Sequence, residues 1–130
     1  MHRKARSQEL LECIQSCKDC HDLCVDTAAY CLGLGGRHAA AKHMRLLLDC
    51  AQVASTTEDY MLRDSAFYEK LCALCADVCD SCAAACAAFS GEAQMQACAG
   101  ACLGCADACR RMMAFGAWQA SQVAQVSCNL

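Results

Sequence analysis

Cysteine is the residue type in this sequence that is best suited to chemistry or metal binding, since the chain carries sixteen cysteines among 130 residues. A thiolate can act as a nucleophile, a redox centre or a ligand for soft metal ions. Near the start of the chain, successive cysteines are separated by four, three, four and seven residues. These gaps follow the turns of an α-helix and predict that the thiols share one helix face. This first row of thiols consists of Cys13, Cys17, Cys20, Cys24 and Cys31.

The same spacing recurs twice later in the chain. Charged residues such as Lys18, Asp77 and Asp107 fall on the opposite helix faces, so we expect the thiols to face a shared core. The second row consists of Cys72, Cys75, Cys79, Cys82 and Cys86, and the third of Cys98, Cys102, Cys105 and Cys109.

The stretch between the first and second rows has only one cysteine, Cys50. Helical spacing places His43 on the same face, either as a metal ligand or as a hydrogen-bonded core histidine. That face should also contain Leu46 or Leu47, Ala54 and Met61. We therefore expect bound metal to gather toward the other three helices.

Dense thiols without an export signal favour metal binding over a disulfide framework. Residues four apart on a helix can close on one ion, as two- or three-coordinate Cu(I) accepts. A continuous stripe supplies pairs rather than the four ligands of structural zinc. The chain has no proline and lacks the loop motif typical of iron–sulfur clusters. We expect the fifteen cysteines named above, with His43, to hold multiple Cu(I) ions; a thiol redox buffer and a Zn(II) reservoir are the alternatives.

Other residues are weaker candidates for metal ligands. Methionines at a bundle end can supply thioether sulfur, although methionine at helical spacing is more often core filler. These residues are Met61, Met95, Met112 and Met113, and Cys128 lies outside the three rows. So many equivalent thiols argue against one tuned nucleophile, so we expect neither a catalytic residue nor enzymatic activity.

The elements that must position these residues are helices. The spacing predicts helices over about residues 7–32, 37–57, 65–89 and 92–115, with residues 116–130 as a tail or short extra helix. Short connections between such helices predict an up-down-up-down four-helix bundle. The expected fold is all-α, with a cysteine-lined core in a single domain over residues 1–130.

The net charge of −3 is spread over the chain, so no basic face suggests a nucleic-acid partner. No apolar run of about 18 residues predicts a membrane span. The basic start of the chain is not followed by the apolar segment of a signal peptide, which favours a cytoplasmic location.

Over residues 10–113 the sequence resembles the cytosolic branch of the bacterial copper storage proteins. The similarity rests on the Cys-x₃-Cys-x₂-Cys-x₃-Cys pattern that begins at Cys13, Cys75 and Cys98, and on the segment Leu48-Asp49-Cys50-Ala51. The resemblance implies Cu(I) storage without turnover, assembly into homotetramers, and a bundle mouth with His or Met residues where copper passes. His43, Ala54 and Met95 occupy positions where this family often has cysteine, which implies a lower capacity than in its thiol-richest members.

Overall fold

The computed structural model describes residues 5–129, with side chains described for residues 5–122. This part of the chain forms four α-helices and one short 3-10 helix, with no β-strand among the described residues. The α-helices are α1 (Gln8–Leu34), α2 (Ala41–Leu62), α3 (Tyr68–Ala87) and α4 (Ala93–Asn129), and the 3-10 helix is η1 (Gly36–Ala39).

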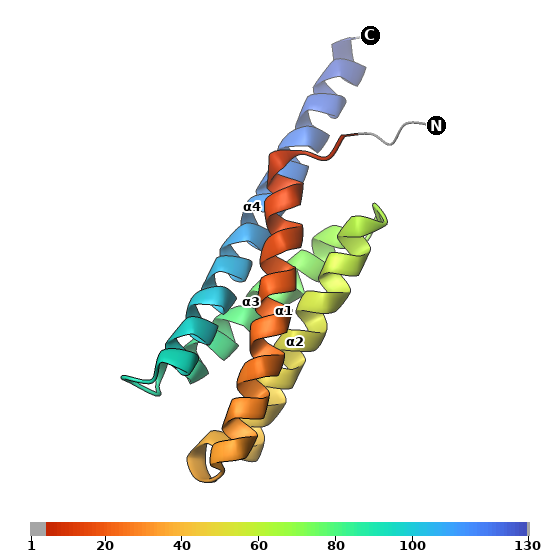
Figure 1. Ribbon diagram of the computed structural model, residues 1–130. Coiled ribbons are helices and arrows are strands. Elements are labelled where there is room, and N and C mark those ends of the chain that lie inside the picture. Colours follow the sequence, from red (N-terminus) through yellow and green to blue (C-terminus); the bar gives the residue numbers. More distant parts are fainter. Residues whose placement is uncertain (1–4, 130) are drawn as a thin grey trace.

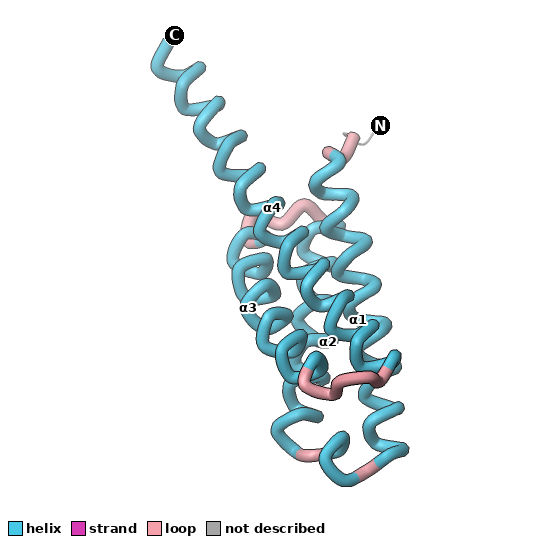
Figure 2. Tube along the Cα trace, turned by 90° about the vertical axis from the view of Figure 1, so that its left-hand side faces the viewer, coloured by secondary structure: helices cyan, strands magenta, loops and turns pink. Residues whose placement is uncertain are grey.

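The four helices form an up-down-up-down bundle, as the sequence predicts (Figure 1). Each helix packs against the next one along the chain, and α4 also packs against α1, which closes the ring. The view turned by 90° shows the same arrangement, with loops at both ends (Figure 2). Each helix therefore presents one face to a common interior that runs along the length of the bundle.

Local signals set both ends of α1. Ser7 caps the first turn, where its Oγ accepts a hydrogen bond from the Leu10 N–H at 3.2 Å. At the other end, Gly35 adopts a φ of 71°, and its N–H donates to the Cys31 carbonyl at 3.0 Å. Glycine suits this left-handed conformation because it has no Cβ, so the chain turns sharply into η1 and α2.

The prediction for the end of the fourth helix was wrong. We expected it to stop near residue 115 at Gly116, but α4 continues to Asn129 and projects beyond the start of α1 (Figures 1 and 2). A Cβ at position 116 would collide with the Tyr68 hydroxyl and lie 2.8 Å from Glu69 Oε1. Gly116 therefore allows α4 to pass close to the start of α3, and it does not terminate the helix.

The second helix is also shifted from its predicted range. It begins at Ala41 because η1 occupies the preceding residues, and it continues through the polar stretch that we expected to end it. Thr57 is fully buried there, and its Oγ1 donates to the Val53 carbonyl at 2.7 Å within the same helix. That bond satisfies the hydroxyl inside the core, and the added turn brings Met61 into the bundle.

The core is built mainly from small side chains. Buried alanines such as Ala51, Ala76 and Ala106 alternate with cysteines along the helices. Cysteine packs as a small hydrophobic residue, so these helices can associate without a large aliphatic core. None of the helices among residues 5–129 combines the length and apolar character needed to cross a bilayer.

Candidate metal centre

The three rows of cysteine on α1, α3 and α4 all face the interior of the bundle. Each of these side chains is completely buried, with an exposed fraction of 0%. All fifteen cysteines with described side chains are free thiols. The prediction that the core is lined with thiols is therefore confirmed.

The second helix supplies one thiol to the middle of this lining. Cys50 Sγ lies 3.7 Å from Cys20 Sγ, 3.7 Å from Cys79 Sγ and 3.8 Å from Cys102 Sγ. These partners come from α1, α3 and α4, so Cys50 completes a ring of thiols contributed by all four helices. On the same face of α2, Leu47 is fully buried, which decides between the two leucines that spacing alone left open.

The thiols gather into groups that draw on more than one helix. In each of four groups the sulfur atoms all lie within 4.8 Å of one another. In order along the bundle the groups are Cys13/Cys72/Cys109, Cys17/Cys75/Cys105/Cys109, Cys20/Cys79/Cys105 and Cys20/Cys24/Cys50/Cys102. Cys109, Cys105 and Cys20 each belong to two groups, so shared sulfurs link all four groups into a continuous row.

This arrangement corrects one step of the sequence argument. We expected cysteines four apart to pair on one ion, and Cys75 and Cys79 do lie 3.8 Å apart. However, two of the groups collect four thiols across helices, so the number of ligands does not exclude tetrahedral zinc. The sharing of sulfurs between neighbouring groups is what favours Cu(I), because it suits a chain of ions with two or three bridging thiolates each.

The electrostatics of the row couple metal binding to proton release. The hydrogen bond between Cys20 and Cys102 lowers the pKa of Cys20 and raises the pKa of Cys102, so one thiolate of such a pair is stabilised by the other thiol. Cys31 lies away from these groups, and burial raises the pKa of its thiol. A metal ion that binds thiolate must therefore displace protons from most of these sulfurs.

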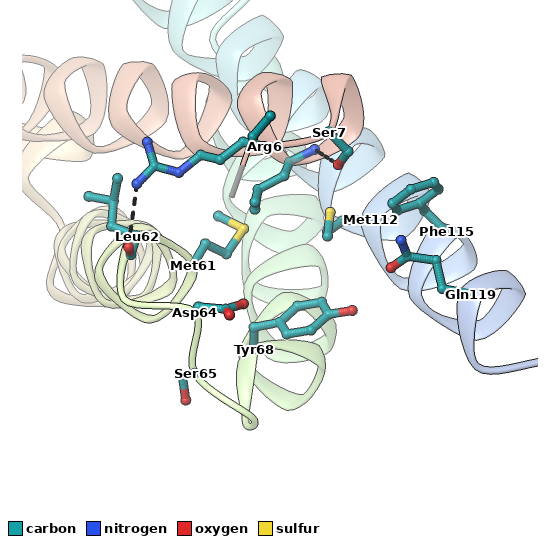
Figure 3. Close-up of a pocket in the computed structure, with 12 residues that line it drawn as sticks. Arg6, Ser7, Met61, Leu62, Asp64, Ser65, Tyr68, Met112, Phe115 and Gln119 are labelled. Carbon is teal, nitrogen blue, oxygen red and sulfur yellow. Dashed lines mark hydrogen bonds between the residues drawn. The ribbon is translucent and has the colours of Figure 1, made fainter. Parts of the chain in front are cut away.

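One end of the bundle opens into a pocket of about 360 Å³. Figure 3 shows Met61 from α2 and Met112 from α4 at this pocket, near Tyr68 and Phe115. Both methionines are almost fully buried, with exposed fractions of 2% and 5%. The pocket lies at the end of the bundle where the row begins with Cys13, so thioether sulfurs separate the thiol row from solvent there.

The opposite end of the bundle is closed by its loops. Phe89 is 5% exposed, and its ring lies 5.1 Å from that of His43 and 4.4 Å from that of His38, measured between centroids. The Arg37 guanidinium lies over Phe89 at 4.3 Å and donates to the Ala88 carbonyl at 3.1 Å. The α1–α2 connection is thus tied to the α3–α4 connection across this end.

The histidines occupy three different environments. His43 is buried at the closed end, with its Nε2 3.6 Å from Cys31 Sγ. His21 pairs with Asp22 on the surface. His38 is half-buried and bonds Glu92 Oε1 through Nε2 at 2.7 Å. Helical spacing could not predict that contact, because His38 lies between α1 and α2 whereas Glu92 lies between α3 and α4.

The methionines divide between the two ends. Met95 is fully buried at the closed end, with its Sδ 3.7 Å from Cys31 Sγ. Met113 only packs against the outside of the core. The side chain of Cys128 lies outside the described residues.

A four-helix bundle with a continuous buried row of thiols defines a class of protein that binds soft metal ions. Residues 6–114 match the family model of the copper storage proteins. This chain therefore belongs to the copper storage protein family.

Solved structures agree with this assignment. The protein Nmul_A1745 from Nitrosospira multiformis is 39% identical, with a TM-score of 0.78, covering 83% of this chain and 97% of that one. The Cu(I)-bound copper storage protein BsCsp3 of Bacillus subtilis is 36% identical, with a TM-score of 0.76, over 82% and 99% of the two chains. A cytosolic copper storage protein from Streptomyces lividans, studied with five coppers, is 29% identical, with a TM-score of 0.74, over 82% and 93%.

Proposed function

We propose that this protein stores multiple Cu(I) ions along the row of thiols inside its bundle. The observation that carries this proposal is the linkage of the four thiol groups through Cys20, Cys105 and Cys109. Each shared sulfur can bridge two ions, so neighbouring sites form a chain and not one isolated centre. Because Cu(I) carries one positive charge, a chain with about one thiolate per ion stays close to neutral in a low-dielectric core.

The proposed ligands are the fifteen buried cysteines of the core together with His43. The middle and pocket-end thiols fall within the four groups, whereas Cys82 and Cys86 continue the lining on α3 beyond them. On α4, Cys98 Sγ lies 3.8 Å from Cys24 Sγ and extends the row in the same direction. We propose that copper enters through the pocket beside Met61 and Met112, because the opposite end is closed by Phe89 and Arg37.

Burial of the thiols argues for storage and against a redox buffer or enzymatic turnover. Thiol–disulfide exchange needs a sulfur that a partner's thiolate can reach, and the exposed fraction of each core thiol is 0%. We propose a cytoplasmic location, as described for the relative from Streptomyces lividans. We further propose that residues 1–130 act as one domain.

Assembly into a homotetramer is proposed from the family resemblance and from the surface of α4. Leu103 is 55% exposed, and a Cβ at Gly100 or Gly104 would meet open space within this chain. These glycines therefore do not serve close packing inside the bundle. They leave part of the α4 surface without side chains, and we propose that a second copy of the chain packs there. We propose neither a nucleic-acid nor a membrane partner.

Anaerobic titration of the fully reduced protein with Cu(I), followed by gel filtration and metal analysis, tests the storage function. We expect about one copper per core thiol to co-elute and to resist a competing chelator. A separate portion of the reduced protein, loaded first with Zn(II), should release zinc when Cu(I) is added. Retention of zinc against Cu(I), or co-elution of only one or two copper ions, would contradict storage of Cu(I).

A further inference from the structure

The inward-facing row of positions on α4 continues beyond the end of the bundle. Buried positions recur on this helix at intervals of three and four residues, and the last of them is Gly116. The same intervals lead on to Gln119, Val123 and Val126, and α4 stays helical through all three positions. A repeat of three and four residues is the pattern by which one helix packs on another. We call these three positions the α4 seam.

Among the described residues, no other helix of the chain lies against the α4 seam. The first helix begins at Gln8 and the third at Tyr68, which meets α4 at Gly116. From Ala117 to Asn129 the helix projects alone, over roughly 20 Å (Figures 1 and 2). This projecting part also lies beyond the match to the copper storage family, which ends at residue 114.

The composition of the projecting helix favours packing against another helix. Residues 112–130 include no charged side chain, so no ion pairs support this part of the helix in water. At 100° per residue, the polar residues Ser121, Gln122, Gln125 and Asn129 fall on the face opposite the seam. A solitary helix of this length is only marginally stable in water, so we expect the seam to be covered.

The direction of the seam restricts what can cover it. The inward face of α4 packs on α1 and α3 inside the bundle, so the seam faces the space directly above the entrance pocket. A helix on the seam that ran parallel to α4 would have to rise out of the space that α1 and α3 fill. Its covering helix must therefore run antiparallel to α4 and end at the pocket.

A second copy of the chain supplies a helix with these properties. Its own projecting helix is as long as the seam that it has to cover, and it is equally free of charge. Two such helices can pair about a twofold axis, with the two bundles at opposite ends of the pair and clear of one another. The same surface is then used by both copies.

We propose that the α4 seams of two copies pair antiparallel about Val123, and that each projecting helix covers the entrance pocket of the other copy. Gln119, which lines the pocket, and position 127 each lie four residues from Val123. Position 127 of the second copy therefore lies level with Gln119, and Cys128 lies one residue further toward the bundle. The sixteenth cysteine thus comes to the entrance beside Met61 and Met112, from the other copy. The covering of the entrance rests on the proposed function, which places copper entry at this pocket.

The pairing is expected to be reversible. Three positions on each helix make a small contact, and small interfaces belong to partners that separate readily. The seam lies on a different face of α4 from Leu103, so the pairing does not compete with assembly through that surface. Copper would then enter when the pair is open and be held when it is closed.

A disulfide between copies tests the pairing. Val123→Cys and its control Gln122→Cys are both made with Cys128→Ser, and the other fifteen thiols are completely buried. The two copies of residue 123 face each other at the twofold axis, whereas Gln122 is exposed on the outer face of the helix. With oxidised glutathione at low protein concentration, we expect Val123→Cys to shift from one chain to two on a non-reducing gel, and Gln122→Cys to stay as one chain. No linked chains in Val123→Cys, or equal linkage in both variants, would overturn the pairing.

The rate of copper uptake tests the covering of the entrance. After the same oxidation, we expect linked Val123→Cys to take up Cu(I) from a chelator complex several-fold more slowly than Gln122→Cys, and to reach the same capacity. Linkage with equal uptake rates would overturn the covering while the pairing stands. Linkage with no copper uptake by either variant would refute storage, and the pairing would still be supported by the gel.

Discussion

Cys20 Sγ and Cys50 Sγ lie 3.7 Å apart, although 30 residues separate them in the sequence. Cys50 is the only cysteine on α2, and this contact places it in the middle of the thiol row. We expected metal to gather away from the second helix, but Cys50 also contacts thiols of α3 and α4. One cysteine is therefore enough to bring all four helices into the proposed copper chain.

Replacement of this cysteine should remove a bridging ligand. We expect Cys50→Ala to reduce the copper capacity by at least one ion, since Cys50 contacts three other thiols. The change removes a single buried heavy atom, so the free energy of unfolding of the apo protein should fall by only about 1 kcal/mol. Metal analysis after gel filtration and circular dichroism measure the two effects. Ser81→Ala, on the exposed face of α3, is the control, and a capacity equal to that of this control would contradict the bridging role.

The pocket lined by Met61 and Met112 should govern the rate of loading. We expect the double variant Met61→Leu/Met112→Leu to take up Cu(I) several-fold more slowly, because weak thioether ligands that capture the ion are lost. The final capacity should not change, since the thiol row is intact. Stopped-flow uptake from a Cu(I)–chelator complex measures the rate. Met44→Leu, at the other end of α2, controls for loss of a methionine, and equal rates in the two proteins would place the entrance elsewhere.

Much of this architecture could be predicted from the spacing of cysteines. The period of three and four residues placed the thiols on helix faces, and every one of the fifteen described is buried. The end of α4 could not be predicted in the same way. The role of Gly116 depends on the Tyr68 hydroxyl of α3, a contact that exists only after the helices have packed.

The contacts between side chains at the closed end of the bundle could not be predicted from the periodicity of each helix alone. His43 could be placed on the face of Cys50, and Met95 in line with Cys98. Their convergence on Cys31 depends on how far α1, α2 and α4 are shifted along one another. Helical periodicity gives the face of a side chain but carries no information about that shift.

Phe89 should control access to the closed end. Truncation of a buried phenylalanine costs about 3–5 kcal/mol, so Phe89→Ala should destabilise the apo protein by about 3 kcal/mol at this end position. We expect alkylation of Cys31 in the variant to become much faster than alkylation of Cys79 in the middle of the bundle. Timed iodoacetamide labelling followed by peptide mass spectrometry measures both. Phe67→Ala, whose parent side chain is 61% exposed, should leave the order of labelling unchanged.

The same preference for Cys31 in the Phe67→Ala control, or no preference in Phe89→Ala, would show that Phe89 does not seal this end. Because both thiols are measured in one sample, a general loss of stability cannot mimic the result. It would speed labelling at both positions.

The apo protein should lose stability at high pH. Burial raises the pKa of Cys31 above its ordinary value of 9.0, so the folded protein keeps a proton that the unfolded chain releases. This contribution is fully present below about pH 9 and is lost as the pH rises through the higher folded pKa. We expect the thermal midpoint to fall between pH 8 and about pH 10.5, and to fall less in Cys31→Ala. If the thermal midpoints of the two reduced proteins fall in parallel with pH, Cys31 does not contribute to this loss of stability.

The hydrogen bond from Arg37 to the Ala88 carbonyl has a consequence for the order in which copper ions are bound and released. Because the bundle core is closed at this end, copper bound in it has to enter and leave through the pocket at the other end. We therefore expect the Cu(I) ion nearest the pocket of Met61 and Met112 to leave first and the ion nearest Phe89 to leave last. One chain of 130 residues would then hold a quickly exchanged fraction of copper together with a slowly exchanged one.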